Sequence, residues 1–366
     1  MAYYYVDPVS GSDTTGDGLS DGNAWQTLQH ALDNITKDTY GDQINLKSSG
    51  ANVLTADLSF STYFPTTSTT GLDQLVIRGY GSVANDGGVG VISGDDSFQI
   101  TALNDTSLID LEIRNTDPAV DGIASLNNYS RLINCYLHTI NRDAIGSTLG
   151  RTQIIGCRFE NISRTACRSM TGYMHNCYFA NGADYAFTNA LNLSAQGHVV
   201  NCIFDLSGGS NGVDCTSLGN AVNNCTFYGR GSGFGTAYLN GGSEARGSSF
   251  TENIIAGFSS GKGVDIQSNA NLLMTNNSFH DVGTPITDPA TGGTDAYTAN
   301  SGNETLASGD NPLAESGART FDNRMTYFAP LNVGSVLSGA LPRGAAPSPG
   351  STGGGSSYSL HPLAYN

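Results

Sequence analysis

Charged and aromatic side chains recur at matching positions of short segments along the middle of the chain. When these segments are aligned, two rows of side chains alternate with apolar positions. The first row is Glu112, Tyr136, Arg158, Tyr178, Ile203 and Thr226, and the second is Arg114, His138, Glu160, Ala180, Asp205 and Tyr228. The charged members on three successive segments form a compact patch that two tyrosines flank: Glu112, Arg114, His138, Arg158, Glu160, Tyr136 and Tyr178.

This patch has the residue types needed to bind or cut a polysaccharide. Glu160 and Asp205 fall two segments apart, roughly 9.6 Å at ~4.8 Å per strand. An inverting glycosidase holds its two carboxyl groups ~6.5–9.5 Å apart, so this pair is a candidate acid and base. In a lyase, Arg158 or His138 would be the base.

Two other interpretations of the same patch need no catalysis. It could be a contact surface for another subunit or a weakly bound glycan. It could also be an ordinary solvated strand face, because exposed faces need polar residues and stacked opposite charges satisfy one another at little net gain. The sequence favours the solvated face over the catalytic site.

The elements that carry these rows are predicted from a repeat. Eight four-residue segments recur: DLEI, NCYL, GCRF, NCYF, NCIF, NCTF, GSSF and NNSF. Their last residues are Ile113, Leu137, Phe159, Phe179, Phe204, Phe227, Phe250 and Phe279, which are 24, 22, 20, 25, 23, 23 and 29 residues apart. Within a segment the pattern has a period of two, which is strand alternation, so Ile133, Cys135 and Leu137 are expected to point inward. His175 is likewise expected at an inward, satisfied core position.

A repeat of this length is too short for a βαβ unit, which needs ~30 residues. It suits a parallel β-helix in which Phe stacks on Phe, Cys on Cys, and asparagines form a ladder at a turn. Leucine-rich repeats share the period, but Leu is sparse and no helical half-repeat is visible. The predicted fold is an all-β, single-stranded parallel β-helix with a short N-terminal capping helix and an extended C-terminal tail.

The predicted organisation has four parts. Residues 1–40 form an N-terminal cap whose helix lies within 26–36, with Thr27 as N-cap and Trp25 beside it. The β-helix spans 41–285, a capping region spans 286–342, and a Gly/Ser/Pro-rich linker and tail span 343–366. The tail ends in apolar residues that could anchor it on a neighbouring subunit: Tyr358, Leu360, Leu363 and Tyr365.

Composition limits the possible ligands. The formal net charge is −16, from 16 Lys and Arg against 32 Asp and Glu, and no apolar run approaches the ~18 residues of a membrane span. We therefore expect neither nucleic acid nor a membrane as a partner. The seven cysteines are odd in number and lack a zinc-type spacing, which predicts buried thiols in a reducing compartment.

Four aspartates near the N-terminus are candidate ligands for Ca²⁺. Asp7, Asp13, Asp17 and Asp21 are spaced at four to six residues, unlike an EF-hand loop. Asp and Gly are also the residues that form turns, and this interpretation is favoured. No other cofactor or metal is expected.

The chain resembles right-handed parallel β-helix proteins of the pectate-lyase-like superfamily. The resemblance rests on YYVDPVSGSDTTGDGLSDGNAWQTLQHAL, on the NCxF segments and on NPLAESGARTF…GSVLSGALPRGA, and it covers most of 1–345. The superfamily includes polysaccharide lyases and hydrolases, adhesins and phage virion proteins. Its catalytic signatures are missing here: there is no Arg-x-x-Pro element, no acidic cluster like its Ca²⁺ site, and no paired Asp-Asp.

Three functions follow from the resemblance. The favoured one is a non-enzymatic phage virion protein, a capsid decoration, cement or tail component most like the phage-associated members. It would assemble in the host cytoplasm as a homo-oligomer, such as a trimer, and contact the major capsid protein or a host glycan. The alternative is a lyase or hydrolase that depolymerises a bacterial or algal polysaccharide. An adhesin is third, because MAYYYVDPVSGSD lacks the basic and apolar regions of a secretory signal.

Overall fold

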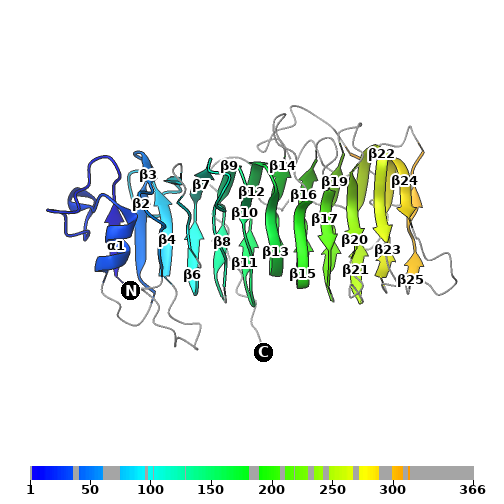
Figure 1. Cartoon of the computed structure of the whole chain (residues 1–366), viewed down its shortest axis with the longest axis horizontal. Helices are drawn as coiled ribbons and strands as arrows, with labels where there is room; N and C mark the ends of the chain where they lie inside the picture. Colours follow the sequence, from blue (N-terminus) through cyan, green and yellow to red (C-terminus); the bar gives the residue numbers. More distant parts are fainter. Residues whose placement is uncertain are drawn as a thin grey trace.

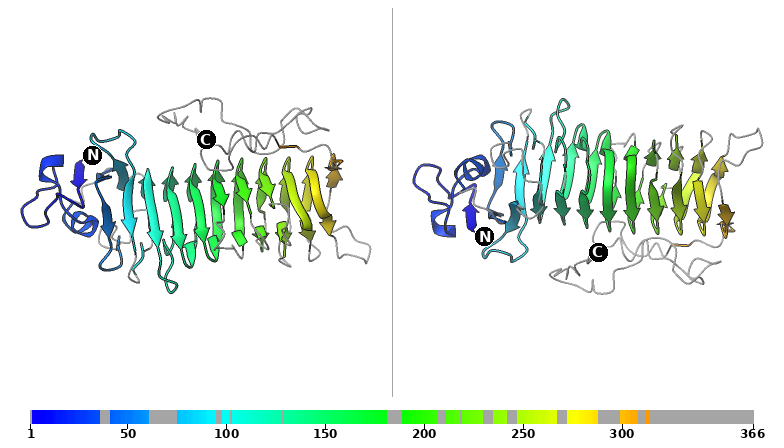
Figure 2. Two further views of the ribbon diagram at one scale, coloured as in Figure 1. Left: turned by 90° about the horizontal axis from the view of Figure 1, so that it is seen from above. Right: turned by 90° about the horizontal axis from the view of Figure 1, so that it is seen from below.

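The computed structural model is a right-handed parallel β-helix whose coils stack along one long axis, with the N-terminal cap at one end (Figure 1). The predicted fold class is confirmed. The structure describes residues 2–35, 41–60, 75–94, 98–101, 103–127, 129–180, 189–206, 211–217, 219–229, 235–241, 247–266, 272–287, 299–307 and 312–313. The strands of successive coils pair in parallel along the axis (Figure 2), and the pairings form three sheets, of which the complete coils supply one strand each.

Sheet 1 comes first in each coil. Its strands, in stacking order, are β1 (Tyr3–Val6), β2 (Gln43–Lys47), β4 (Leu75–Tyr80), β6 (Thr106–Ile109), β8 (Arg131–Ile133), β11 (Gln153–Ile155), the end of β13 (Thr165–His175), the end of β15 (Asn189–Val200), β18 (Ala221–Asn223), β21 (Ser248–Thr251), β23 (Leu272–Thr275) and β25 (Ala299–Ser301).

Sheet 2 follows sheet 1 in each coil and carries the two rows of candidate residues. Its strands are β3 (Ala51–Val53), β5 (Gly90–Ser93), β7 (Leu111–Asn115), β9 (Tyr136–Ile140), β12 (Arg158–Ile162), β14 (Tyr178–Ala180), β16 (Ile203–Asp205), β19 (Thr226–Tyr228), the start of β22 (Ile254–Ile266), the start of β24 (Ser278–Thr287) and β26 (Glu304–Thr305).

Sheet 3 completes each coil. It begins as single bridges at Leu58, Ile100 and Ile123 and continues through β10 (Asp143–Ile145), the starts of β13 and β15, β17 (Asn211–Cys215), β20 (Thr236–Asn240) and the ends of β22 and β24.

The turn between sheets 1 and 2 explains the recurring Asn-Cys pair. Asn134, Asn176, Asn201 and Asn224 all have φ between 53° and 56°, a left-handed conformation that Asn tolerates better than most residues. The turn resets the strand alternation, so Leu132 points inward, Ile133 points outward, and Cys135 points inward again. The expectations that Ile133 and the equivalent His175 point inward are therefore wrong.

The cysteines that follow these turns form a hydrogen-bonded column inside the solenoid. The N–H of Cys177 donates to Sγ of Cys202, and the N–H of Cys202 donates to Sγ of Cys225, each at 3.4 Å. In the next coil Asn253 takes the same position and accepts from the N–H of Cys225 at 2.8 Å. All seven cysteines are buried free thiols, and burial raises the pKa of Cys177 and its neighbours in the column.

Phenylalanines form a second column in the core. The rings of Phe159, Phe179, Phe204 and Phe227 stack almost parallel, with centroids 4.9, 4.6 and 4.6 Å apart. Phe250 does not continue this column, contrary to the sequence alignment. It lies in sheet 1 opposite Val222, and Ile255 instead pairs with Phe227, because this coil is longer than the preceding ones.

The N-terminal cap closes the solenoid as predicted. Helix α1 (Leu28–Asn34) begins at the N-cap Thr27, whose side chain accepts from the N–H of His30, and a 3₁₀ turn, η1 (Asp21–Asn23), precedes it. Its buried face, Leu28, Ala31 and Leu32, continues into Ile35. Trp25 is 6% exposed and lies against this cap.

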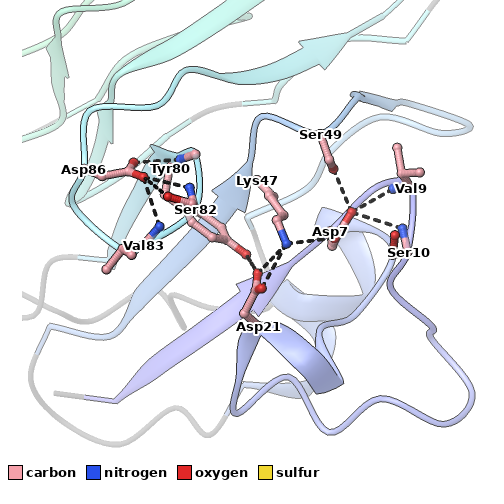
Figure 3. A network of polar contacts seen from close by, with 11 residues as sticks. Asp7, Val9, Ser10, Asp21, Lys47, Ser49, Tyr80, Ser82, Val83 and Asp86 are labelled. Carbon is pink, nitrogen blue, oxygen red and sulfur yellow. Dashed lines mark hydrogen bonds and ion pairs between the residues drawn. The ribbon is translucent and has the colours of Figure 1, made fainter.

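A polar network ties the loop before α1 to the first coils (Figure 3). Lys47 Nζ lies 3.3 Å from Asp7 and 2.7 Å from Asp21, and the hydroxyl of Tyr80 donates to Asp21. Burial alone would raise the pKa of Asp7, but hydrogen bonds from Ser49, the neighbouring backbone and Lys47 outweigh it and lower that pKa to about 2. Asp7 is therefore ionised in the folded protein above this pH.

Replacing Lys47 with Met should destabilise the fold most at neutral pH. The folded pKa of Asp7 lies below its unfolded value, so its stabilising effect is present above about pH 4 and is lost as the pH falls through about 2. We expect Lys47→Met to lower the free energy of unfolding by about 1–3 kcal/mol at pH 7. The loss should be smaller at pH 3 in urea denaturation. Lys262→Met, which removes a more exposed ion pair, is the control and should change little.

The β-helix extends beyond its predicted end. Parallel pairing continues through β24, β25 and β26 to Thr305, one coil past residue 285. The tail, with Tyr358, Leu360, Leu363 and Tyr365, lies outside the described residues.

Candidate functional site

The two predicted rows lie on the outer face of sheet 2 in the predicted register. Along the first row, Tyr136 pairs with Glu112 on one side and Arg158 on the other, and the row continues through Tyr178, Ile203 and Thr226. Along the second row, His138 pairs with Arg114 and Glu160, followed by Ala180, Asp205 and Tyr228. The expected alignment of these strands is confirmed.

Glu160 is the centre of the first group of contacts. Its Oε2 accepts from Arg158 Nη2 at 2.6 Å and from the Tyr136 hydroxyl at 3.0 Å. The Tyr136 ring has the Arg158 guanidinium over it at 4.3 Å and the His138 ring stacked on it at 4.2 Å. Both contacts use the ring faces of Tyr136, so this tyrosine is poorly placed to stack on a sugar.

The same contacts distinguish the two candidate bases. Burial opposes the charge of Arg158, but its hydrogen bond to Glu160 outweighs burial and raises the pKa of the guanidinium, which stays a cation. His138 instead has Nε2 3.0 Å from Glu112 Oε1 and Nδ1 2.9 Å from the Thr139 hydroxyl. Nε2 is buried and makes no hydrogen bond in the structure, so Glu112 is its charged neighbour, in the place that the orienting carboxylate of a catalytic histidine takes. His138 is therefore the better base candidate.

The outer face of sheet 2 changes character at β14. The side chains of Arg158 and Glu160 are 28% and 16% exposed, whereas Tyr178 is 2% exposed. Tyr178, Ala180, Ile203, Ile254, Ala256 and Leu313 form a second apolar cluster outside the solenoid core, with Tyr228 and Leu306 against it. Leu313 and Leu306, which come after β26, therefore pack against this half of the face.

This cover removes the predicted carboxylate pair. Asp205 is 1% exposed and accepts a hydrogen bond from the Tyr178 hydroxyl at 3.1 Å. It cannot face a substrate together with Glu160, although both stand in the expected row. Tyr178 likewise does not flank an open patch.

A cluster of arginines and aspartates, which the sequence analysis missed, lies where sheet 2 turns into sheet 3. Asp143 is fully buried. It accepts hydrogen bonds from Nε and Nη2 of Arg164, and Arg168 Nε lies 3.1 Å from its Oδ2. On the preceding coil, Asp121 Oδ1 lies 3.3 Å from Arg142 Nε without a hydrogen bond between them. Burial of Asp121, with the charge of Asp143, raises its pKa, and Arg142 and Arg168 act against this.

The outer ends of these arginines remain accessible. The side chains of Arg142, Arg164 and Arg168 are 33%, 40% and 47% exposed. Three guanidinium groups exceed the two buried carboxylates, so this corner presents positive charge to solvent. In the sequence, Arg142-Asp143 and Arg164 stand at matching places of successive repeats, which could have indicated this cluster. Only the stacking of the coils brings the side chains together.

Arginines are grouped on this side of three coils, among the five carboxylates of the same stretch: Glu112, Asp117, Asp121, Asp143 and Glu160. Residues 111–169 contain seven arginines and five carboxylates, a net of +2, in a chain whose net charge is −16. Arg114 and Arg158 lie on sheet 2, Arg142 and Arg164 on its turn into sheet 3, and Arg168 on the start of β13, in sheet 3. We call this surface the arginine face.

The N-terminal aspartates act in local structure. Asp13 accepts from the N–H groups of Gln26 and Thr27, and Asp17 accepts from the N–H of Leu19, while Asp7 and Asp21 bind Lys47. Among the described residues, no group of three or more His, Cys, Asp or Glu side chains is placed to hold a metal ion. Within the same part of the chain, no helix has the length and apolar character needed to cross a membrane.

Comparison with solved structures identifies the fold. Pectate lyase Pel9A superposes with a TM-score of 0.56 over 95% of each chain at 15% identity. A rhamnogalacturonan lyase reaches 0.48 at 13% identity, over 76% of this chain and 87% of its own. The native GH136 lacto-N-biosidase from Eubacterium ramulus reaches 0.47 at 13% identity, over 83% and 68%.

The match to pectate lyase Pel9A shows a shared parallel β-helix of the pectate-lyase-like type. No family model matches the chain, and no curated protein matches its sequence. The three structures carry the names of glycan-cleaving enzymes, and the virion role stays a prediction.

Proposed function

We propose that the protein binds an anionic polysaccharide on the arginine face and cleaves it by β-elimination. The observation that carries the proposal is the grouping of five arginines on one side of three coils in a strongly acidic chain. Guanidinium groups bind carboxylates through paired hydrogen bonds, so an acidic sugar is the ligand that this surface suits. The name of the neighbour Pel9A, a pectate lyase, agrees with this class of polymer.

β-Elimination needs a base and a means of neutralising charge. The base removes the proton from the carbon beside the sugar carboxylate, and its electron pair forms a carbon–carbon double bond. The glycosidic carbon–oxygen bond then breaks, and the leaving oxygen takes a proton from water. Arginines around the carboxylate stabilise the charge that develops when the proton leaves.

His138 is the residue we assign to the base. It stands in the middle strand of the arginine face, two residues before Ile140 and the turn that carries Arg142. Glu112 holds one side of its ring, and Arg158 remains charged beside Tyr136. Hydrolysis by Glu160 and Asp205 is disfavoured, because Asp205 is buried.

Removing charge from the arginine face should weaken binding of polygalacturonate. We expect Arg114→Gln with Arg168→Gln to raise the dissociation constant at least 10-fold, since each loses a charge-assisted contact. Binding should also weaken with added salt, and less steeply in the double variant. Affinity electrophoresis or calorimetry measures both effects.

Arg151→Gln is the matched control, because Arg151 lies before sheet 1, exposed, with its guanidinium 5.6 Å from the Tyr129 ring centroid. The control removes one charge and the double variant two, so a control effect half as large in free energy would show that net charge alone matters. Failure of the intact protein to bind polygalacturonate, alginate and dextran sulfate would reject the proposed function.

A further inference from the structure

We infer that the apolar packing of Leu313 on β14, β16 and β22 closes one end of the binding face, so that the protein holds the end of a polysaccharide instead of its middle. This inference rests on the proposed function and adds the mode of binding. It concerns the outer face of sheet 2, where one row of side chains can be followed from an open end to a covered end.

One row of residues runs along the solenoid axis through successive parallel pairs: Val53, Ser93, Arg114, His138, Glu160, Ala180 and Asp205. At its first end, Val53 is 50% exposed. The side chain of Glu160 is 16% exposed, and in the next two coils Ala180 falls to 7% and Asp205 to 1%. Ser93 is fully buried beneath Arg114, whose Nε donates to its hydroxyl at 3.2 Å, and the Arg114 side chain is 38% exposed. The face is therefore accessible at Val53 and from Arg114 to Glu160, and it is closed from β14 onward.

The closure is made by apolar packing. Leu313 is 1% exposed and belongs to one cluster with Tyr178, Ile203 and Ile254, which lie on β14, β16 and β22. Apolar side chains on the outside of a solenoid are unfavourable in water. Packing Leu313 on them removes this apolar surface from water, which stabilises the cover. A ligand passing over β14 would have to displace this packing.

The length of the open face limits what it can hold. Strands β3, β5, β7, β9 and β12 span four coil steps, about 19 Å at ~4.8 Å each. One coil step is close to the length of one sugar in an extended chain. A polymer lying along the row would therefore fill about five positions and end against Tyr178 and Leu313.

The cover can be tested without any glycan by labelling single introduced cysteines. All seven native cysteines are buried, so a thiol reagent should not react with them in the folded protein. We expect Ala180→Cys to react at least 10-fold more slowly than Val53→Cys, its matched control at the open end of the same row. Adding Leu313→Asp should bring the reaction of Ala180→Cys close to that of the control.

Equal labelling of Ala180→Cys and Val53→Cys in the otherwise native chain would overturn the cover. This comparison does not depend on the Leu313→Asp variant, whose folding circular dichroism would check.

Oligogalacturonates of increasing length then test the mode of binding. We expect the affinity of the native chain to level off at about five sugars, and its products to come from one end of the polymer. In Leu313→Asp the affinity should continue to rise with length and the products should become random.

If affinity in the native chain rises well past this length, or cleavage is random, the inference fails while the proposed function stands. If no oligomer binds, both fail, and only protection of Ala180→Cys would remain as a property of the fold.

Discussion

His138→Ala should lower the rate of polygalacturonate cleavage by about 100- to 10,000-fold, the usual contribution of a general base. Binding should change by no more than a few-fold, because the arginines that contact the carboxylates remain. The ring stands between Glu112 and Thr139 on the middle strand of the arginine face, and no second imidazole lies on the described part of β7, β9 or β12. Ultraviolet absorbance of the unsaturated product measures the rate directly.

His198→Ala is the matched control, because His198 stacks on Tyr173 on the outer face of sheet 1, away from the arginine face. Unchanged cleavage by His138→Ala would remove His138 from the mechanism. A parallel fall in both variants would indicate general damage to the fold. Glu112→Gln should give a smaller loss than His138→Ala, since it only releases one side of the ring.

Phe204→Ala should lower the free energy of unfolding by about 3–5 kcal/mol. Phe204 is fully buried, with Phe179 and Phe227 stacked on its two sides at 4.6 Å. Neighbouring coils are held by the parallel ladders and cannot move in to fill the space, so a cavity should remain. Urea unfolding followed by circular dichroism measures the loss.

Tyr173→Ala provides the control for that measurement. Tyr173 is 36% exposed on the outer face of sheet 1, and its truncation should lower the free energy of unfolding by about 1 kcal/mol or less. A loss at Phe204 no larger than at Tyr173 would mean that the aromatic column contributes little to the stability of the solenoid.

The sequence predicts the register of sheet 2 because each repeat carries its own alignment signal. A left-handed turn residue marks the same point in these coils, Asn before Cys in four of them and Asp110 and Gly156 in two others, so the rows through Glu112 and Arg114 align correctly. The sequence does not predict which residues of sheet 1 point inward, because the turn at Asn134 interrupts the alternation of inward and outward side chains. Ile133 therefore points outward. Phe250 was misplaced because its coil is longer.

The candidate site depends on contacts that no repeat encodes. Leu313 reaches β14 from outside the repeat, and nothing in the segments around Tyr178 or Asp205 shows that they are covered. The corner of Arg142, Arg164 and Asp143 forms only when two turns stack. The repeat therefore predicts which residues align on neighbouring strands, whereas tertiary packing determines which of these side chains are exposed to solvent.

The interchange of Cys and Asn in the interior column has a consequence for how such a protein can evolve. Either residue completes the same hydrogen bond at the turn, as Cys225 and Asn253 show. The step from Phe204 to Phe227 takes 23 residues and the next step to Ile255 takes 28, yet both pairs stay in register. Selection can therefore lengthen, shorten or exchange the connecting loops of single coils, and diversify the surface, without disturbing the scaffold beneath.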